Sequence, residues 1–254
     1  MKLCLFAVSS IWKRDMLRLS RQKSRILFSL FSPIFLLAFL SLGFSKVDVL
    51  YEMNIDYLSY LAPGMMGMTL LSSANTTSLF LLWDRELGFL KEIMVTPISR
   101  QSIILGRSAV GITNSLIQSM ILLLAGLVMG MKISGHLELL LSLPFIILIA
   151  STSIGMGLSL ASFVKDTFSF NLALSFILYP LLFFSGAFYP VDRFPVYIVP
   201  LAHLNPLTYG IDGLRYSLLG ISSFHPALDL GVMVISCIAM LSLGAYLFEI
   251  CEVE

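Results

Sequence analysis

Six long stretches without a charged residue constrain the fold of this chain more than any other feature. They are Ile26–Ser45, Tyr57–Trp83, Ser108–Met131, Leu139–Val164, Thr167–Val191 and Leu230–Phe248. Each reaches or slightly exceeds the roughly 17–25 residues that a helix needs to cross a bilayer. None alternates in polarity as the strands of a membrane barrel do. The sequence therefore predicts an all-α, multi-pass membrane protein with six spans.

Composition supports this prediction. The chain is 57% hydrophobic and only 12% charged, whereas a soluble domain has about 25% charged residues.

Gly155 and Gly157 lie within the fourth uncharged stretch. Because small residues let helices approach closely in a membrane, we expect another helix to pack against this one there.

The positive charges are divided unequally between the two sides of the predicted membrane. With the N-terminus in the cytoplasm, twelve of the sixteen Lys and Arg residues lie inside: Lys2, Lys13, Arg14, Arg18, Arg21, Lys23, Arg25, Arg85, Lys91, Arg100, Arg107 and Lys165. Only Lys46, Lys132, Arg193 and Arg215 lie outside. Cationic residues favour the cytoplasmic side, so both termini are predicted to be cytoplasmic.

Residues 2–25 predict an amphipathic helix that lies on the membrane surface. The apolar face consists of Leu5, Val8, Trp12, Met16 and Leu19, and the opposite face of Arg14, Arg18, Arg21 and Arg25. We expect the basic face to meet anionic headgroups. A plain basic tail is the alternative interpretation.

The segment 190–225 is interrupted by prolines and charges. Its apolar pieces, Val196–Leu204 and Leu207–Leu219, are too short to cross a bilayer. We expect two short helices that enter from the outside and return. Asn205 and Pro206 predict the start of the second one, with Asn as N-cap and Pro as the first helical residue.

The predicted spans lack the buried acids and bases that ion-coupled transporters use. Their central polar residues are amides and hydroxyls, which bond a substrate or a neighbouring helix: Asn75, Thr76, Thr77, Asn114, Gln118 and Asn171. The chain also has no phosphate-binding loop, nucleophile elbow or zinc motif. We therefore expect no catalytic or metal site, and any transport would need energy from another chain.

The cytoplasmic segment 84–100 suggests where that energy enters. Glu86–Val95 predicts a short helix with acids near its start, ended by Thr96 and Pro97. It presents the apolar side chains of Phe89 and Ile93 among charged residues. A surface of this kind is suited to a groove on a partner protein. An ordinary interfacial loop is the alternative.

The run D-R-E-L-G-F-L-K-E-I-M-V-T-P-I-S-R, which starts at Asp84, resembles the cytoplasmic motif of type-2 ATP-binding-cassette (ABC) transporter permeases. F-F-S-G-A-F-Y-P at 183–190 and L-N-P-L-T-Y-G-I-D-G-L-R at 204–215 resemble the outer signature of that family. Within it, the chain looks most similar to daunorubicin-resistance-type drug-export permeases. Residues 1–254 would then form a single transmembrane domain.

The resemblance implies that segment 84–100 is a coupling helix seated on a separate ATPase. The contacts would come from Asp84, Arg85, Glu86, Phe89, Leu90, Glu92, Ile93, Thr96, Pro97 and Arg100. Two ATPase subunits, a second permease copy or paralogue, and membrane lipids are the expected partners, and nucleic acid is not. ATP and Mg would bind the ATPase, while this non-catalytic chain would bind no cofactor.

The resemblance also implies a substrate path along the second and fifth spans, closed outside by the short helices. The path residues would be Met65, Met68, Asn75, Phe183 and Phe184, and those of the outer segment Asn205, Pro206, Tyr209, Asp212 and Arg215. The expected cargo is an amphipathic drug, lipid or glycan, moved out of the cytoplasm or inner leaflet of a prokaryotic inner membrane. The alternative is a passive channel or a lipid-acting membrane enzyme.

Overall fold

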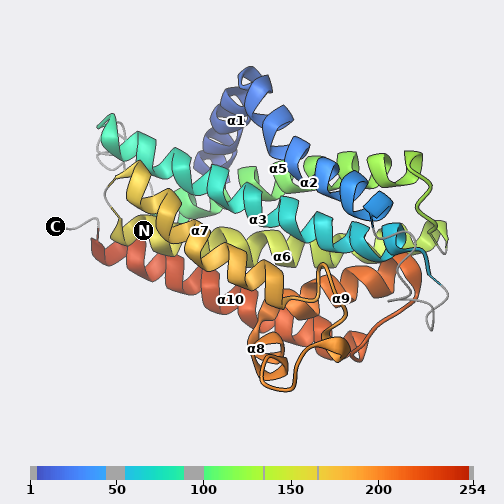
Figure 1. Ribbon diagram of the computed structural model, residues 1–254. Coiled ribbons are helices and arrows are strands. Elements are labelled where there is room, and N and C mark those ends of the chain that lie inside the picture. The colour runs from blue at the N-terminus through green and yellow to red at the C-terminus, as the bar shows by residue number, and fades with distance from the viewer. Residues whose placement is uncertain (1–4, 44–54, 89–99, 134, 165, 252–254) are drawn as a thin grey trace.

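The computed structural model describes residues 5–43, 55–88, 100–133, 135–164 and 166–251 (Figure 1). Within these ranges the chain is helical and contains no strand. The helices are α1 (Leu5–Arg21), α2 (Lys23–Gly43), α3 (Tyr57–Glu86), α5 (Arg100–Val128), α6 (His136–Phe163), α7 (Thr167–Phe184), α8 (Val199–Leu204), α9 (Pro206–Leu219) and α10 (Pro226–Cys251). A short 3-10 helix, η2 (Val191–Arg193), follows α7.

Five of the described helices are long and apolar enough to cross a membrane: α2, α5, α6, α7 and α10. The chain is thus an integral membrane protein, as its composition predicts. The remaining predicted span is α3, which has 30 residues but is more polar than those five. Six spans therefore stay a prediction.

Helix α3 is polar because it packs against protein. It lies among α2, α5, α6, α7 and α9 (Figure 1), and Ser59, Thr69 and Ser78 on it are buried. The Thr69 hydroxyl donates to the Met66 carbonyl at 2.7 Å, so this polar atom costs little inside the bundle. In Figure 1 α3 runs from right to left, and we name its two ends by the charges buried there: the Arg215 end and the Asp84 end.

Close approach of α6 and α10 confirms the prediction made from Gly155. A Cβ added at Gly155 would lie 2.6 Å from the Met240 carbonyl carbon, and one at Gly244 would lie 3.0 Å from the Gly155 oxygen. Small residues allow two membrane helices to pack backbone against backbone in this way.

A helix is present near the N-terminus, and two arginines of its basic face also contact the rest of the protein. The side that α1 buries carries Ala7, Ile11 and Asp15. Arg14 and Arg18 form ion pairs with Asp84 of α3. These two arginines thus bind a buried carboxylate of the bundle while remaining partly exposed, and their contact with lipid headgroups stays a prediction.

Two helices extend beyond the uncharged stretches that predicted them. The uncharged stretch begins at Leu230, but α10 begins at Pro226 and takes in the buried Asp229. Helix α3 continues past Trp83 to Glu86, so Asp84 lies within it. Both helices extend into charged sequence because neighbouring helices, rather than lipid, surround those turns.

Between α7 and α10 the structure contains the two short helices expected from the proline pattern. Helix α8 has 6 residues and α9 has 14. The Asn205 side chain accepts a hydrogen bond from the Leu207 amide at 3.0 Å, and Pro206 is the first residue of α9. The predicted helix start is thus confirmed.

Candidate functional site

A buried carboxylate at the Asp84 end binds three arginines from two other helices. Asp84 accepts hydrogen bonds from Arg14 Nη2 at 2.9 Å, Arg18 Nη1 at 3.1 Å and Arg107 Nη2 at 2.6 Å. Asp84 is 4% exposed and Arg107 only 1%. The three arginines come from α1 and α5, so this one side chain of α3 joins three helices.

A second buried carboxylate balances part of this positive charge. Asp15 accepts a hydrogen bond from Arg14 Nε at 2.8 Å and lies 3.9 Å from Arg107 Nη1. We call Arg14, Asp15, Arg18, Asp84 and Arg107 the Asp84 cluster. It holds three cations and two anions, of which Arg107, Asp15 and Asp84 are buried, and the loss of Asp84 would leave the buried Arg107 with Asp15 as its counter-charge at 3.9 Å.

The two residues after Asp84 bind two further helices. Arg85 Nη1 donates to the carbonyls of Ala161 at 3.1 Å and Val164 at 3.2 Å, where α6 ends. A cation at that position is favourable because the helix dipole is negative there. Glu86 Oε1 accepts from the Thr167 amide and hydroxyl at 3.2 and 2.8 Å, where α7 begins.

Three consecutive residues of α3 therefore hold α1, α5, α6 and α7. The resemblance implied that Asp84, Arg85 and Glu86 bind the ATPase. The structure shows that all three also make contacts within the chain, and their contact with an ATPase stays a prediction. The expected helix from Glu86 is wrong at its start, because α3 ends at Glu86 and Gly88 has φ +75°. The left-handed conformation at Gly88 turns the chain away from the axis of α3.

The other predicted ATPase contacts are not tested. Phe89, Leu90, Glu92, Ile93, Thr96 and Pro97 lie outside the described residues, and Arg100 opens α5 with a side chain that is not described either. These contacts stay a prediction. What the structure does describe is the short turn, Leu87 and Gly88, between the Asp84–Glu86 triplet and that segment.

The turn between α6 and α7 is stabilised by Asp166. Its carboxylate caps α7 and accepts a hydrogen bond from the Ser169 amide at 2.8 Å. This amide holds the pKa of Asp166 below its ordinary value. The cap sits next to the Glu86–Thr167 contact, so the start of α7 is held from two sides.

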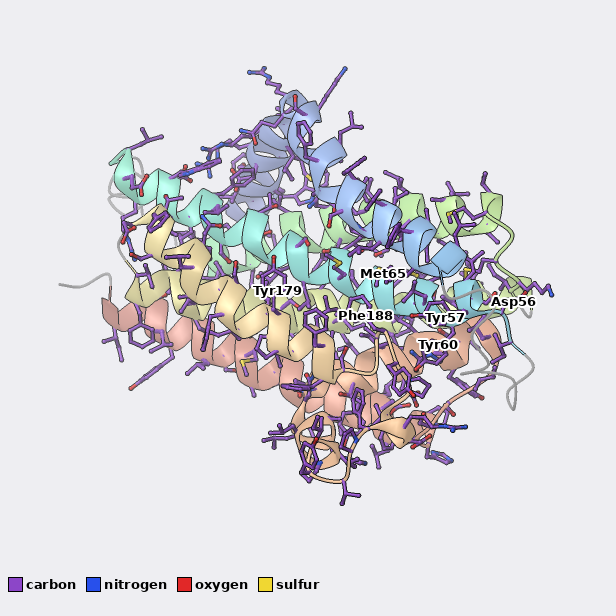
Figure 2. The ribbon with its side chains drawn as sticks, viewed as in Figure 1. Asp56, Tyr57, Tyr60, Met65, Tyr179 and Phe188 are labelled. Carbon is purple, nitrogen blue, oxygen red and sulfur yellow. The ribbon has the colours of Figure 1, made fainter. Side chains whose placement is uncertain are left out.

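The Arg215 end of the bundle is organised around one backbone carbonyl. Arg215 Nη2 donates to the Gly186 carbonyl at 3.0 Å, and the Tyr60 hydroxyl donates to the same oxygen at 3.1 Å. The Arg215 guanidinium also lies 3.9 Å from the centroid of the Tyr60 ring, a cation–π contact. Tyr57 donates to the Phe188 carbonyl at 3.1 Å (Figure 2), so α9, α3 and the turn after α7 are fastened together.

Two aspartates lie behind Arg215. Asp212 accepts hydrogen bonds from the backbone amides of Ser223 and Phe224, each at 2.9 Å, and ties the loop before α10 to α9. Burial raises the pKa of Asp212, while these amides oppose the shift. Asp229 is fully buried and close enough to Asp212 for the two negative charges to repel each other. Among the described residues, neither oxygen of Asp229 has a hydrogen-bond partner.

The predicted outer residues are thus brought together, with additions that the sequence reading missed. Asn205, Pro206, Tyr209, Asp212 and Arg215 all belong to α9 or its cap, and Tyr209 donates to the His203 carbonyl at 2.9 Å. The missed residues are Tyr60, Gly186 and Asp229. Pro226, a typical first helical residue, could have placed Asp229 inside the last helix.

The predicted substrate-path residues do not share one surface. Met65 is fully buried within the chain, whereas Phe183 is 57% exposed and stacks on Phe188. Met68 and Phe184 are partly buried, and the side chain of Asn75 lies outside the described residues. Met65 therefore contacts this chain's own core in this conformation, and the path stays a prediction.

Comparison with known proteins shows the family to which the chain belongs. A family model described as ABC-2 type transporter matches residues 7–219. The chain is 32% identical over 214 residues to the putative transport permease ycf38 of Porphyra purpurea, covering 82% of this chain and 72% of that one. It is 26% identical over 245 residues to the inner membrane transport permease YadH of Escherichia coli K12, covering 94% and 93%. Nodulation protein J of Rhizobium leguminosarum is 28% identical over 236 residues, covering 89% and 87%.

Proposed function

Since the chain belongs to the ABC-2 type transporter family, we propose that it is the membrane permease of an ATP-driven exporter whose ATPase is a separate chain. The observation that carries this proposal is the triplet Asp84–Arg85–Glu86. It binds α1, α5, α6 and α7, and the segment after Gly88 is the one expected to meet the ATPase.

Force applied to the segment after Gly88 would reach the bundle through these contacts. A displacement of the end of α3 moves the Asp84 carboxylate relative to arginines on α1 and α5. It also pulls on the end of α6 and the start of α7 through Arg85 and Glu86. Coupling between two sites needs a structural element that can adopt two discrete arrangements. The ion pairs of the Asp84 cluster would form such an element if they exchange partners as the helices move.

The rest of the assembly follows from the same proposal. The Asp84 end faces the cytoplasm of a prokaryotic inner membrane, with both termini on that side. Two ATPase subunits, which bind ATP and Mg, act on two permeases, the second being a copy or a paralogue. The cargo is an amphipathic drug, lipid or glycan.

Co-expression with the ATPase tests the proposal. Neighbouring reading frames in the genome identify the ATPase, and we expect the two chains to purify together in fixed stoichiometry with ATPase activity stimulated by the permease. Glu86→Ala, which frees the start of α7, should reduce that stimulation about fivefold or more. Asp56→Ala is the matched control, because it removes an exposed acid at the other end of α3.

Two results would reject the proposal. One is a permease that moves solute or modifies lipid without any ATPase, which would indicate a channel or an enzyme. The other is equal ATPase stimulation in the Glu86→Ala and wild-type complexes, which would mean that the triplet does not transmit force.

A further inference from the structure

A cavity of about 230 Å³ lies between α7 and α10, and no residue of the Asp84 cluster lines it. Its walls come from the middle of α3 and α6, and the break between α8 and α9 closes one end. Ile177 and Leu181 line it from α7, and Met233 and Met240 from α10. The cavity exists because α7 packs against α3, α6 and α9 and leaves space beside α10.

The polar groups on the cavity wall are already bonded within the protein. The hydroxyls of Thr152 and Ser153 each donate to a carbonyl four residues earlier at 2.8 Å. Asn205 accepts from the Leu207 amide and donates to the Leu181 carbonyl at 2.6 Å. Among the described residues, no charged side chain lines the cavity, and apolar atoms make up most of its wall. A ligand there meets no counter-charge from these residues, so its buried part should be apolar.

Side chains of α7 at and near the cavity are exposed in the described structure. Ile177, which lines the cavity, is 37% exposed, and on the same helix Phe176 is 82% and Tyr179 57% exposed. Since α7 and α10 are both candidate spans, lipid would surround the space between them. An empty cavity would deprive its lining of dispersion contacts.

We propose that one acyl chain of a bilayer phospholipid occupies this cavity and holds α7 apart from α10. A flexible unbranched chain fits a narrow apolar space, and the thioethers of Met156, Met233 and Met240 adapt to its shape. Headgroup recognition is not required, because the walls offer none. The proposal is independent of the transport function.

Photolabelling in vesicles tests it. The full chain is reconstituted in phosphatidylcholine with a diazirine on one acyl chain, irradiated and mapped by mass spectrometry. Met233 is 1% exposed and lines the cavity, so it should be labelled only if a chain enters. Ile235, 70% exposed on the same helix, reports ordinary lipid contact. The absence of label at Met233, with Ile235 labelled, overturns the proposal.

A cavity-filling variant gives the second arm. Ser153→Leu should reduce the label at Met233 at least fivefold and leave Ile235 unchanged, and Leu181→Phe does the same from α7 if the first variant does not fold. Gly231→Leu is the matched control, since it adds bulk where a Cβ would meet no atom of a neighbouring element within 4 Å.

Unchanged labelling of Met233 in both cavity-filling variants contradicts the proposal. So does labelling that appears only with ATP and the ATPase, because it would identify transported cargo rather than a resident lipid.

Discussion

The two ends of α3 bury charge in opposite ways. At the Asp84 end, arginines outnumber carboxylates and the bonds join side chains of different helices. At the Arg215 end, carboxylates outnumber the arginine and most bonds go to backbone groups of turns. Side-chain ion pairs can exchange partners as helices move, whereas bonds to backbone groups hold a loop in one place. We infer that the Asp84 end transmits movement and the Arg215 end resists it.

The largest expected effect comes from Asp84→Ala. It leaves the buried Arg107 with Asp15 as its counter-charge at 3.9 Å and removes the ion pairs of Arg14 and Arg18 with α3, which should cost about 3–5 kcal/mol of stability. Thermal unfolding of the purified chain in detergent measures the loss. Asp56→Ala, whose partner Lys132 is exposed, should change stability by about 1 kcal/mol or less, and equal losses would contradict the interpretation of the Asp84 cluster.

The Arg215 end should respond more to backbone spacing than to charge. A Cβ at Gly64 would collide with the Ala187 backbone, next to the Gly186 carbonyl, so Gly64→Ala should cost about 1–3 kcal/mol. Gly231→Ala, also within a helix but with open space around it, should be neutral or slightly stabilising. The same unfolding assay compares them, and a tolerated Gly64→Ala would show that α3 and this turn are not held rigidly.

Asp229→Asn tests whether removing the charge of a buried aspartate has opposite effects on stability at the two ends of α3. Asp229 is buried without a hydrogen-bond partner among the described residues, so removing its charge should leave stability unchanged or raise it by about 1 kcal/mol. Asp84→Asn should instead destabilise the chain. If Asp229→Asn lowers the unfolding temperature as much as Asp84→Asn, its carboxylate has a favourable partner and the contrast fails.

The smallest effect concerns the α6–α7 turn. Asp166→Ala should lower the unfolding temperature slightly at pH 7, because the cap on α7 is lost. The pKa of Asp166 is depressed in the folded chain, so the contribution of the cap is present above the unfolded pKa and disappears as pH falls through the folded pKa. Wild type and variant should therefore converge under acidic conditions, and a difference that persists there would exclude this cap as its cause.

Much of the architecture could be predicted from local pattern. The long apolar stretches located α2, α5, α6 and α7, and the Asn205–Pro206 pair located the start of α9. Such features depend on bilayer thickness and helix capping, which act over a few turns of the chain. Local pattern could not predict the contacts that Asp84, Arg85 and Glu86 make within the chain, because their partners lie on helices far away in the sequence.

The sequence by itself determined that this is a helical membrane protein of the ABC-2 type, because its uncharged stretches and spaced motifs need no three-dimensional information. Only the tertiary structure decided what the Asp84–Glu86 triplet does within the described residues. A charged residue beside a span has the same local signature whether it contacts another protein or its own neighbours. The contacts within the chain depend on packing, because α1, α5, α6 and α7 bring arginines, carbonyls and a helix start within bonding distance of the end of α3.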